Sequence, residues 1–192
     1  MNTKTIGIEE YIQYRKEIAT GDLIQFSSFS ILGWLIRKFS GYCNHSSQAI
    51  RFAEYQGLKQ RRYILEALEH GIELSLISRR LEGYKGKVWW HPLKPEYQKY
   101  RRKIGALALS RIGIPYDYGS LFKNALGRVS GNANRLFCSE YVYLNCKDVG
   151  MPIKTEWQDK SPRPADMLNL GFWDQDGIII HDSRNVIHGK DI

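Results

Sequence analysis

The sequence predicts one α+β domain over residues 1–192, with a mainly antiparallel sheet packed against helices. Three observations support this fold class: strand-like runs cluster along the chain, helical patterns are segregated around them, and regular βαβ alternation is absent. A chain of 192 residues that is 43% hydrophobic can bury one core without disulfides or a structural metal. No repeat, low-complexity segment or Pro/Gly/Ser-rich linker divides it, so we expect a single domain.

The first half of the chain predicts two helices and three strands. Apolar residues from Ile8 to Ile18 have helical spacing, and the helix is expected to end near Gly21, because glycine suits a C-terminal cap. A second helical pattern covers Ile31–Phe39. Short runs of strand character are expected at Asp22–Phe26, at about Ser46–Phe52, and at Arg62–Leu68.

The second half predicts two strands and the two clearest helices. Val88–Trp90 forms a strand that ends before Pro92. Pro95 then opens a helix with an apolar stripe that ends just before Gly113. A further helix is expected from about Cys138 to Val149, and a last edge strand at Ile178–Ile180.

Charge and composition exclude several classes of protein. The net charge is +8, from 28 Lys and Arg against 20 Asp and Glu, which favours anionic partners. The basic clusters are dispersed and no nucleic-acid-binding motif is present, so we interpret them as solvated faces and expect no nucleic acid partner; contact with an anionic surface or membrane interface stays open. No stretch approaches the roughly 20 apolar residues of a membrane-spanning helix. With no signal-peptide pattern and an odd count of three cysteines, we expect reduced thiols in the cytoplasm.

Cys138 is the candidate nucleophile, because it lies at the predicted start of a helix. Backbone N–H groups and the partial positive charge of a helix N-terminus favour the thiolate, which is the nucleophilic form. The alternative is a small buried residue without chemistry. Cys146 lies eight residues later on the same helix and is expected to be structural. Cys43, close to His45, is assigned a structural role as well.

A nucleophilic cysteine needs a base and a group that orients the base. His45 opens a predicted strand and is the candidate base, although a hydrogen-bonded structural histidine is the commoner case. The other four histidines compete with it: His70, His91, His181 and His188. No close group of His, Cys, Asp or Glu has the spacing of metal ligands, so no metal and no cofactor are expected.

Glu66 lies within an apolar predicted strand, where an unpaired carboxylate would cost free energy. Arg61 or Arg62 could pair with it and give it a purely structural role. A pairing with His45 on a neighbouring strand would instead fix the imidazole so that its other nitrogen faces Cys138. Spacing alone does not decide between these two partners.

Several segments resemble the NlpC-type cysteine peptidases. Residues 112–119 (IGIPYDYG) followed by residues 137–140 (FCSE) are similar to the segment that carries the nucleophile of that family. Residues 21–24 (GDLI), His45 and residues 65–67 (LEA) resemble the segment that carries its base. Here the histidine segment comes first, which is the order of the circularly permuted branch.

The helical insert at residues 31–39 and the phrase SPRPAD at 161–166 also resemble that branch, so the resemblance spans roughly residues 20 to 170. It implies a circularly permuted, papain-like fold in which a mainly antiparallel half-barrel packs against helices.

The resemblance also implies roles for individual residues. Cys138 would be the nucleophile, His45 the base and then the acid, and Glu66 the group that orients the imidazole. Tyr116 matches the tyrosine whose hydroxyl lies beside the nucleophile; its alternative reading is a packed tyrosine in a turn. One departure is that Ser46-Ser47-Gln48 follows His45 where the family usually has valine and a small residue. A two-residue slip would place Ser47 at the base position, where a hydroxyl accepts the thiol proton poorly.

The implied function is a thiol amidase or peptidase that cleaves an amide bond in a peptide, isopeptide or muropeptide. A lipid-directed hydrolase or acyltransferase is the second candidate, because permuted relatives act on acyl chains and the apolar helix near Trp34 could meet a lipid interface. Relatives of the lecithin:retinol type carry Asn-Cys-Glu-His at the nucleophile, whereas this chain has Phe-Cys-Ser-Glu, which favours the amidase. The third candidate is an inactive binding module; the sequence leaves the oligomeric state open.

Overall fold

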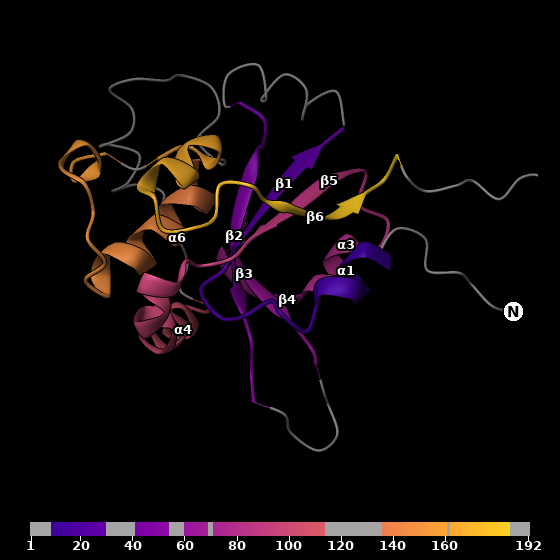
Figure 1. The fold of residues 1–192 in the computed structure, drawn as a ribbon, viewed down its shortest axis with the longest axis horizontal. Coiled ribbons are helices and arrows are strands. Elements are labelled where there is room, and N and C mark those ends of the chain that lie inside the picture. The colour runs from indigo at the N-terminus through magenta and orange to yellow at the C-terminus, as the bar shows by residue number, and fades with distance from the viewer. Residues whose placement is uncertain are drawn as a thin grey trace, which may run out of the picture.

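The fold is a six-stranded antiparallel sheet with helices on both faces (Figure 1). The computed structural model describes residues 9–29, 41–53, 60–68, 71–113, 136–160 and 162–184. The strands lie in the order β4-β3-β2-β1-β5-β6, and every neighbouring pair is antiparallel. Their bounds are β1 Leu23–Ser28, β2 His45–Ile50, β3 Tyr63–Leu68, β4 Gly71–Leu76, β5 Gly86–His91 and β6 Ile178–Asp182.

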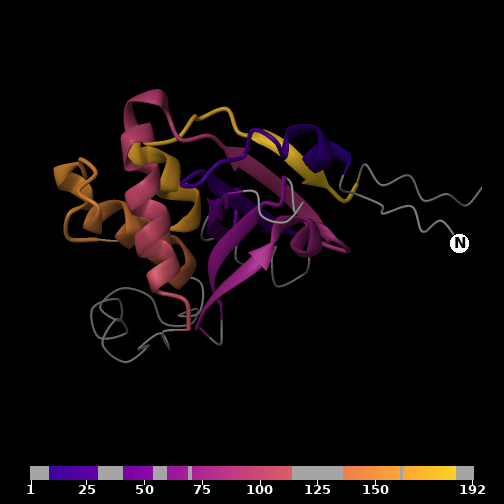
Figure 2. The same cartoon turned by 90° about the horizontal axis from the view of Figure 1, so that it is seen from below.

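The helices form two groups, one on each side of the sheet. The α-helices are α1 Glu9–Tyr14, α3 Ile77–Leu81, α4 Arg101–Ser110 and α6 Leu136–Asp148, and the 3₁₀ segments are η1 Pro95–Tyr100, η3 Thr155–Trp157 and η4 Pro164–Leu170. Helices α4 and α6 lie on one side of the sheet, and the short helices α1 and α3 lie on the other (Figures 1 and 2). The sheet is therefore the middle layer of the molecule.

Alternation along the strands builds a separate core on each face of the sheet. Leu23 on β1 packs in the core beneath α4 and α6, whereas its neighbour Ile24 packs in the core beneath α1 and α3. Leu65 and Ile64 on β3 divide in the same way. Because both faces are covered, the central strands are buried on both sides. Strand β3 is accordingly a nearly continuous apolar run, whereas β2 (HSSQAI) is mostly polar although five of its six residues are buried.

The predicted α+β class with a mainly antiparallel sheet is confirmed, and so is the edge strand at Ile178. The sequence analysis did not predict β4, which pairs with β3 along its whole length, from Tyr63 opposite Leu76 to Leu68 opposite Gly71. Ile72, Leu74 and Leu76 of β4 alternate with Glu73 and Ser75, which is the pattern of a half-buried strand, so the sequence does carry a signal for this strand.

Two predicted helices differ from the structure in their extent. Helix α1 ends at Tyr14 instead of continuing to Ile18, although Ile18 is fully buried. The apolar spacing therefore indicates that these residues are buried, but not that all of them are helical. Ile18 is buried in the segment that follows α1. The helix predicted from Pro95 begins as the 3₁₀ segment η1 and becomes α-helical only at Arg101. The predicted helix at residues 31–39 lies outside the described residues.

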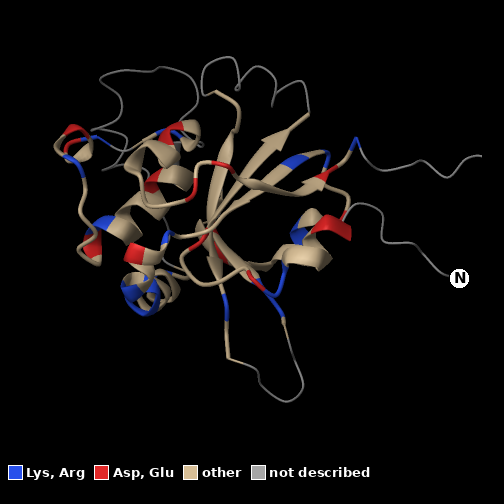
Figure 3. Cartoon of the chain, in the orientation of Figure 1, with Lys and Arg blue, Asp and Glu red and all other residues tan. Residues whose placement is uncertain are grey.

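Two further observations bear on the partners of the chain. Within the ranges given above, no helix combines the length and apolar character needed to cross a membrane. Lys and Arg form one dense run at the start of α4, while the others are scattered over several elements (Figure 3). The interpretation of the basic clusters as solvated faces is wrong for three of their residues, because Arg62 is buried and Arg80 and Arg101 pair with the buried carboxylates of Glu66 and Asp22.

Candidate active site

The strand register places His45 and Glu66 on one face of the sheet. Strands β2 and β3 pair with Gln48 opposite Leu65, so continuing this register sets Glu66 opposite Ser47. His45 is two residues along β2 from Ser47 and therefore projects from the same face, diagonal to Glu66. The His45 Nε2 donates to Oε2 of Glu66 over 2.7 Å. The glutamate side chain is fully buried, and that of His45 is 17% exposed.

Cys138 lies in the first turn of α6, which packs against β2 and β3. Its side chain is buried and hydrogen-bonds to the His45 imidazole, and the backbone at Ser46 and at Ser139 also bonds to its sulfur. Because Nε2 of His45 is engaged by Glu66, the bond to Cys138 falls to Nδ1. The imidazole thus lies between the sulfur and the carboxylate.

The charges of this group are coupled. Burial opposes ionisation of Cys138, but the His45 charge, its hydrogen bond and the two backbone bonds together lower the pKa of the thiol. Burial likewise opposes the charge on His45, yet the Cys138 sulfur and Glu66 raise the pKa of the imidazole to about 10. Both shifts favour a thiolate–imidazolium pair, which is the reactive form of a catalytic cysteine.

Sequence reasoning missed one member of this cluster, Arg80 on α3. Its Nε donates to Oε1 of Glu66 over 3.1 Å. The sequence proposed Arg61 or Arg62 as the structural partner of Glu66, but Arg62 instead donates to backbone carbonyls, over 2.7 Å at Ile18. No signal in the sequence distinguishes Arg80 from Arg79 beside it, because the helix that turns Arg80 toward Glu66 is set by tertiary packing.

The other two cysteines differ from Cys138 in their electrostatics. Burial raises the pKa of Cys146, which lies in the core beneath α6. Burial, with a smaller contribution from the charge of Cys138, raises the pKa of Cys43 well above its ordinary range. Of the three thiols, only Cys138 has a pKa shifted toward the thiolate.

Two of the competing histidines have structural contacts. His91 donates from Nδ1 to the Asp174 carbonyl over 2.9 Å, and burial lowers its pKa. His181 is a buried residue of β6 that donates to the Tyr84 carbonyl over 2.9 Å. His70, His188 and the predicted site residue Tyr116 lie outside the described residues.

A buried polar contact connects the site to η4. Gln25 on β1 is the cross-strand partner of Ser46, and its Nε2 donates to the Pro164 carbonyl over 2.6 Å. The Tyr42 hydroxyl donates to the Oε1 of the same glutamine. These bonds fix the segment after Gly41 and the start of η4 next to the strand that carries His45.

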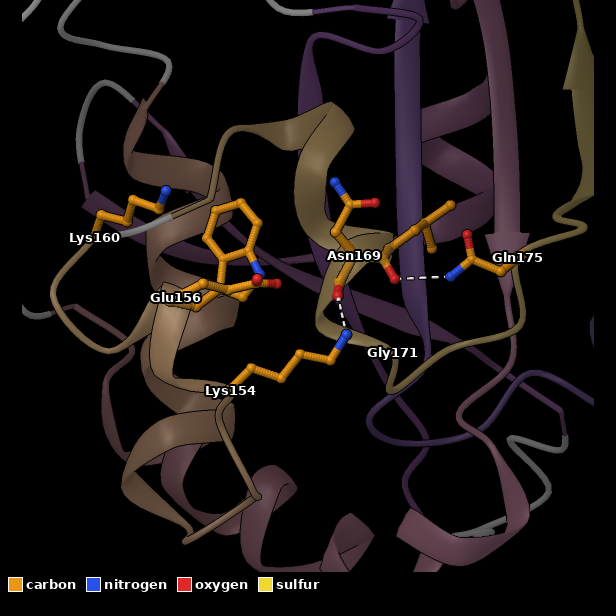
Figure 4. Close-up of a pocket in the computed structure, with 8 residues that line it drawn as sticks. Lys154, Glu156, Lys160, Asn169, Gly171 and Gln175 are labelled. Atoms are coloured by element: carbon orange, nitrogen blue, oxygen red, sulfur yellow. Dashed lines mark hydrogen bonds between the residues drawn. The ribbon is translucent and has the colours of Figure 1, made fainter.

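Neither of two pockets on the described surface is lined by Cys138, His45 or Glu66. One has a volume of about 560 Å³ and lies between the η3 region and η4, with Lys154, Asn169 and Gln175 among its lining residues (Figure 4). There Lys154 donates to the Asn169 carbonyl and Gln175 to the Leu168 carbonyl, so both side chains serve local structure. Among the residues that the structure describes, no group of three or more His, Cys, Asp or Glu is placed to hold a metal ion.

Comparisons with known proteins do not assign a family to this chain. No protein-family model matches the sequence, and no curated protein matches it. One similar solved structure is the metalloprotein YiiX from Escherichia coli O157:H7, with a TM-score of 0.49 and 20% identity. The match covers 69% of this chain and 66% of YiiX, just under two thirds of that protein. A likeness at this level carries no argument about what the chain does.

Proposed function

We propose that the chain is a cysteine hydrolase that cleaves an amide bond through an acyl-thioester on Cys138. The observation that carries the proposal is the position of His45, hydrogen-bonded to Glu66 through Nε2 and to Cys138 on its other side. An oriented imidazole beside a thiol with a lowered pKa is the arrangement that nucleophilic catalysis by cysteine requires.

The proposed reaction has two halves. The Cys138 thiolate attacks the amide carbonyl carbon and forms a C–S bond, and the negative charge moves to the carbonyl oxygen. The His45 imidazolium then gives its Nδ1 proton to the leaving nitrogen as the C–N bond breaks, which leaves a thioester and a free amine. His45 next removes a proton from water, the hydroxide attacks the thioester, and the carboxylic acid and the thiolate are released.

The developing oxyanion needs hydrogen-bond donors. The Cys138 backbone N–H lies in the first turn of α6, where N–H groups point out of the helix N-terminus. With the Tyr116 hydroxyl, which the family resemblance nominates, it is the proposed donor pair. One well-placed donor of this kind is worth roughly 3 kcal/mol of transition-state stabilisation.

The motif resemblance supports a papain-like fold in permuted order. The sheet strands with His45 and Glu66 precede the helix with Cys138 in this chain, as they do in the permuted branch. The resemblance also suggests the substrate class, which is a peptide, isopeptide or muropeptide amide.

Alkylation by iodoacetamide tests the nucleophile without a known substrate. Cys138 should react near pH 6, where an ordinary thiol with a pKa of 9.0 reacts poorly, and Cys43 and Cys146 should not. Mass spectrometry of peptides labelled from pH 5 to 9 assigns the rate to each cysteine. If Cys138 required the same alkaline pH as a free thiol, the site would not be catalytic.

A substrate screen identifies the bond that is cleaved. Wild type and Cys138→Ala are compared on muropeptides, isopeptides and acyl esters, and amide cleavage by the wild type alone is expected. Turnover of acyl esters without amide cleavage would favour the lipid-directed alternative. Equal hydrolysis by wild type and Cys138→Ala would exclude Cys138 as the nucleophile.

A further inference from the structure

Arg80 contacts both oxygens of the Glu66 carboxylate. Its Nε lies 3.1 Å from Oε1 and 3.4 Å from Oε2 of Glu66, while Oε2 accepts from His45 over 2.7 Å. Oε1 therefore accepts from Arg80 on α3, and Oε2 accepts from the imidazole on β2 and, at the longer distance, from Arg80 as well. This arrangement fixes the rotation of the carboxylate about its last bond.

Two aromatic rings hold the guanidinium in place. Arg80 Cζ lies 5.1 Å from the centre of the Phe26 ring and 5.4 Å from that of Tyr84, both within the range of a cation–π contact. Phe26 also contacts the His45 ring at 5.5 Å. The same phenylalanine thus packs against both the base and the arginine, which couples their positions.

The short helix α3 brings Arg80 to this place. Ile77 and Leu81, four residues apart, are fully buried and lay one face of α3 on the sheet. Arg80 projects beside that face and is 31% exposed, whereas Arg79 is 76% exposed and pairs with Glu82. The two neighbouring arginines therefore differ in environment, which provides a matched control.

The charges around Glu66 explain why a cation is needed there. His45 faces Glu66 from β2, Arg80 faces it from α3 beside the Tyr84 ring, and Cys138 lies beyond His45 on α6. Glu73 on β4 is the cross-strand partner of Glu66 and exposed, and like charges in this position repel. Arg80 offsets this repulsion and the cost of burying the carboxylate.

We propose that Arg80 is a positioning residue of the catalytic group, which holds Glu66 ionised and oriented so that the carboxylate fixes the His45 ring. The inference rests on the proposed function, since it extends the Cys138–His45–Glu66 group by one residue. Arg80 touches neither the substrate nor the reacting atoms. Its effect passes through Glu66 to the imidazole and from there to the sulfur.

The test compares Arg80→Met, Arg80→Lys and the control Arg79→Met. Loss of the cation in Arg80→Met should move the pH midpoint of Cys138 alkylation upward and lower the rate at pH 6 by about 3- to 10-fold. Arg80→Lys keeps the charge and should keep the wild-type pH midpoint of alkylation. The alkylation profile of Arg79→Met should be the same as that of the wild type. Arg80→Gln takes the place of Arg80→Met if circular dichroism shows that the latter does not fold.

A second measurement separates this proposal from the proposed function. Nitrogen-15 spectra of the histidine rings, recorded in a Cys138→Ala background, give the pKa and tautomer of His45 without any need for a reactive thiol. The pKa of His45 should fall by about 0.5 or more when Arg80 becomes Met, because a Glu66 carboxylate that is less fully ionised and no longer oriented stabilises the imidazolium less. A rise instead would show that Arg80 acts only as a repelling charge and does not hold Glu66 for His45. An unchanged His45 titration together with an unchanged alkylation profile would overturn the role of Arg80. Ordinary alkylation of Cys138 in the wild type would overturn only the proposed hydrolase.

Discussion

Asn145 on α6 donates from Nδ2 to Oε1 of Gln48 on β2 over 2.9 Å, and both side chains are fully buried. Gln48 follows His45 by three residues, and Asn145 follows Cys138 by seven, or about two helical turns. The bond therefore ties the strand that carries the proposed base to the helix that carries the proposed nucleophile.

Asn145→Ala should lower the free energy of unfolding by about 1–3 kcal/mol, because the Gln48 amide oxygen loses its buried donor. Urea denaturation measures the change. The matched control is Asn169→Ala, since Asn169 is exposed on η4 and should cost less than about 0.5 kcal/mol. Equal stability of the two variants would show that the bond between α6 and β2 contributes nothing.

The proposed ion pair gives the stability a pH dependence of defined sign. The ordinary pKa values are 9.0 for the thiol and 6.5 for the imidazole, whereas folding lowers the pKa of Cys138 and raises that of His45 to about 10. With thiolate and imidazolium in the folded state, both states hold one proton on this pair between pH 6.5 and 9.0, so its contribution is constant there. Below pH 6.5 the imidazole of the unfolded chain binds a proton, so the unfolded state holds two protons on the pair and the folded state one. Above pH 9.0 the thiol of the unfolded chain loses its proton, so the unfolded state holds none, whereas His45 of the folded state keeps its proton up to about pH 10. The contribution of the pair to the free energy of unfolding therefore decreases below pH 6.5 and above pH 9.0, by up to about 1.4 kcal/mol per pH unit.

The pair's contribution is measured as a difference from Cys138→Ala/His45→Gln, which removes both titrating groups. Urea unfolding of the two proteins from pH 5 to 10 should give a difference that is flat from about pH 7 to 8.5 and smaller at either end. A difference that changes steadily across pH 7 to 8.5 would mean that the folded pair is not ionised as proposed.

Asp22, in the Gly-Asp-Leu phrase of the family resemblance, has a structural role here. Its buried carboxylate accepts hydrogen bonds from four groups: Arg101 Nη1 at 2.6 Å, Trp90 Nε1 at 2.8 Å, and the backbone N–H groups of Ala19 at 2.9 Å and Leu93 at 3.0 Å. Asp22→Ala should destabilise the fold by about 3–5 kcal/mol, because it leaves these donors and the Arg101 charge without their acceptor. Thermal and urea unfolding measure this, with the exposed Asp176→Ala as control; a loss below 1 kcal/mol for Asp22→Ala would contradict the assignment.

The sheet was predictable to the extent that burial leaves a pattern in the sequence. Strands such as β3 are buried on both faces, so their apolar runs identify them, and Gly150 marks the end of α6 with a positive φ of 83°. Ile18 shows the limit of this reasoning, because apolar spacing measures burial and does not separate a helix from a buried turn. Strand β4 was predictable from its own side chains, because Ile72, Leu74 and Leu76 alternate with Glu73 and Ser75 directly after Gly71.

The candidate site was predictable only in part for a related reason. Cys138 and His45 sit at the start of regular elements, and Glu66 interrupts an apolar strand, so each has a local signal. Arg80 has none, since in the sequence it is one of two adjacent arginines with the pattern of a solvated face. Only the packing of Ile77 and Leu81 decides which arginine turns toward the carboxylate.

Gly86 at the start of β5 provides a remote test of the cluster around Arg80. A Cβ on Gly86 would lie 2.3 Å from the Ser27 carbonyl oxygen and 2.6 Å from Cε1 of Tyr84, so Gly86→Ala must displace the strand or the ring. We expect a loss of about 1–3 kcal/mol in stability, as for other overpacked positions. Because Tyr84 packs on the Arg80 guanidinium, the rate of Cys138 alkylation at pH 6 should fall as well.

Gly171→Ala separates these two effects. Gly171 has a φ of 82° and open space around its Cβ position, so alanine there strains only the backbone, at a cost of about 1–2 kcal/mol. Both variants should therefore lose stability, but only Gly86→Ala should slow alkylation, measured below the unfolding midpoint of either protein. If both variants slowed it equally, general loosening of the fold would account for the effect, and contact between Tyr84 and Arg80 would not be needed to position Glu66.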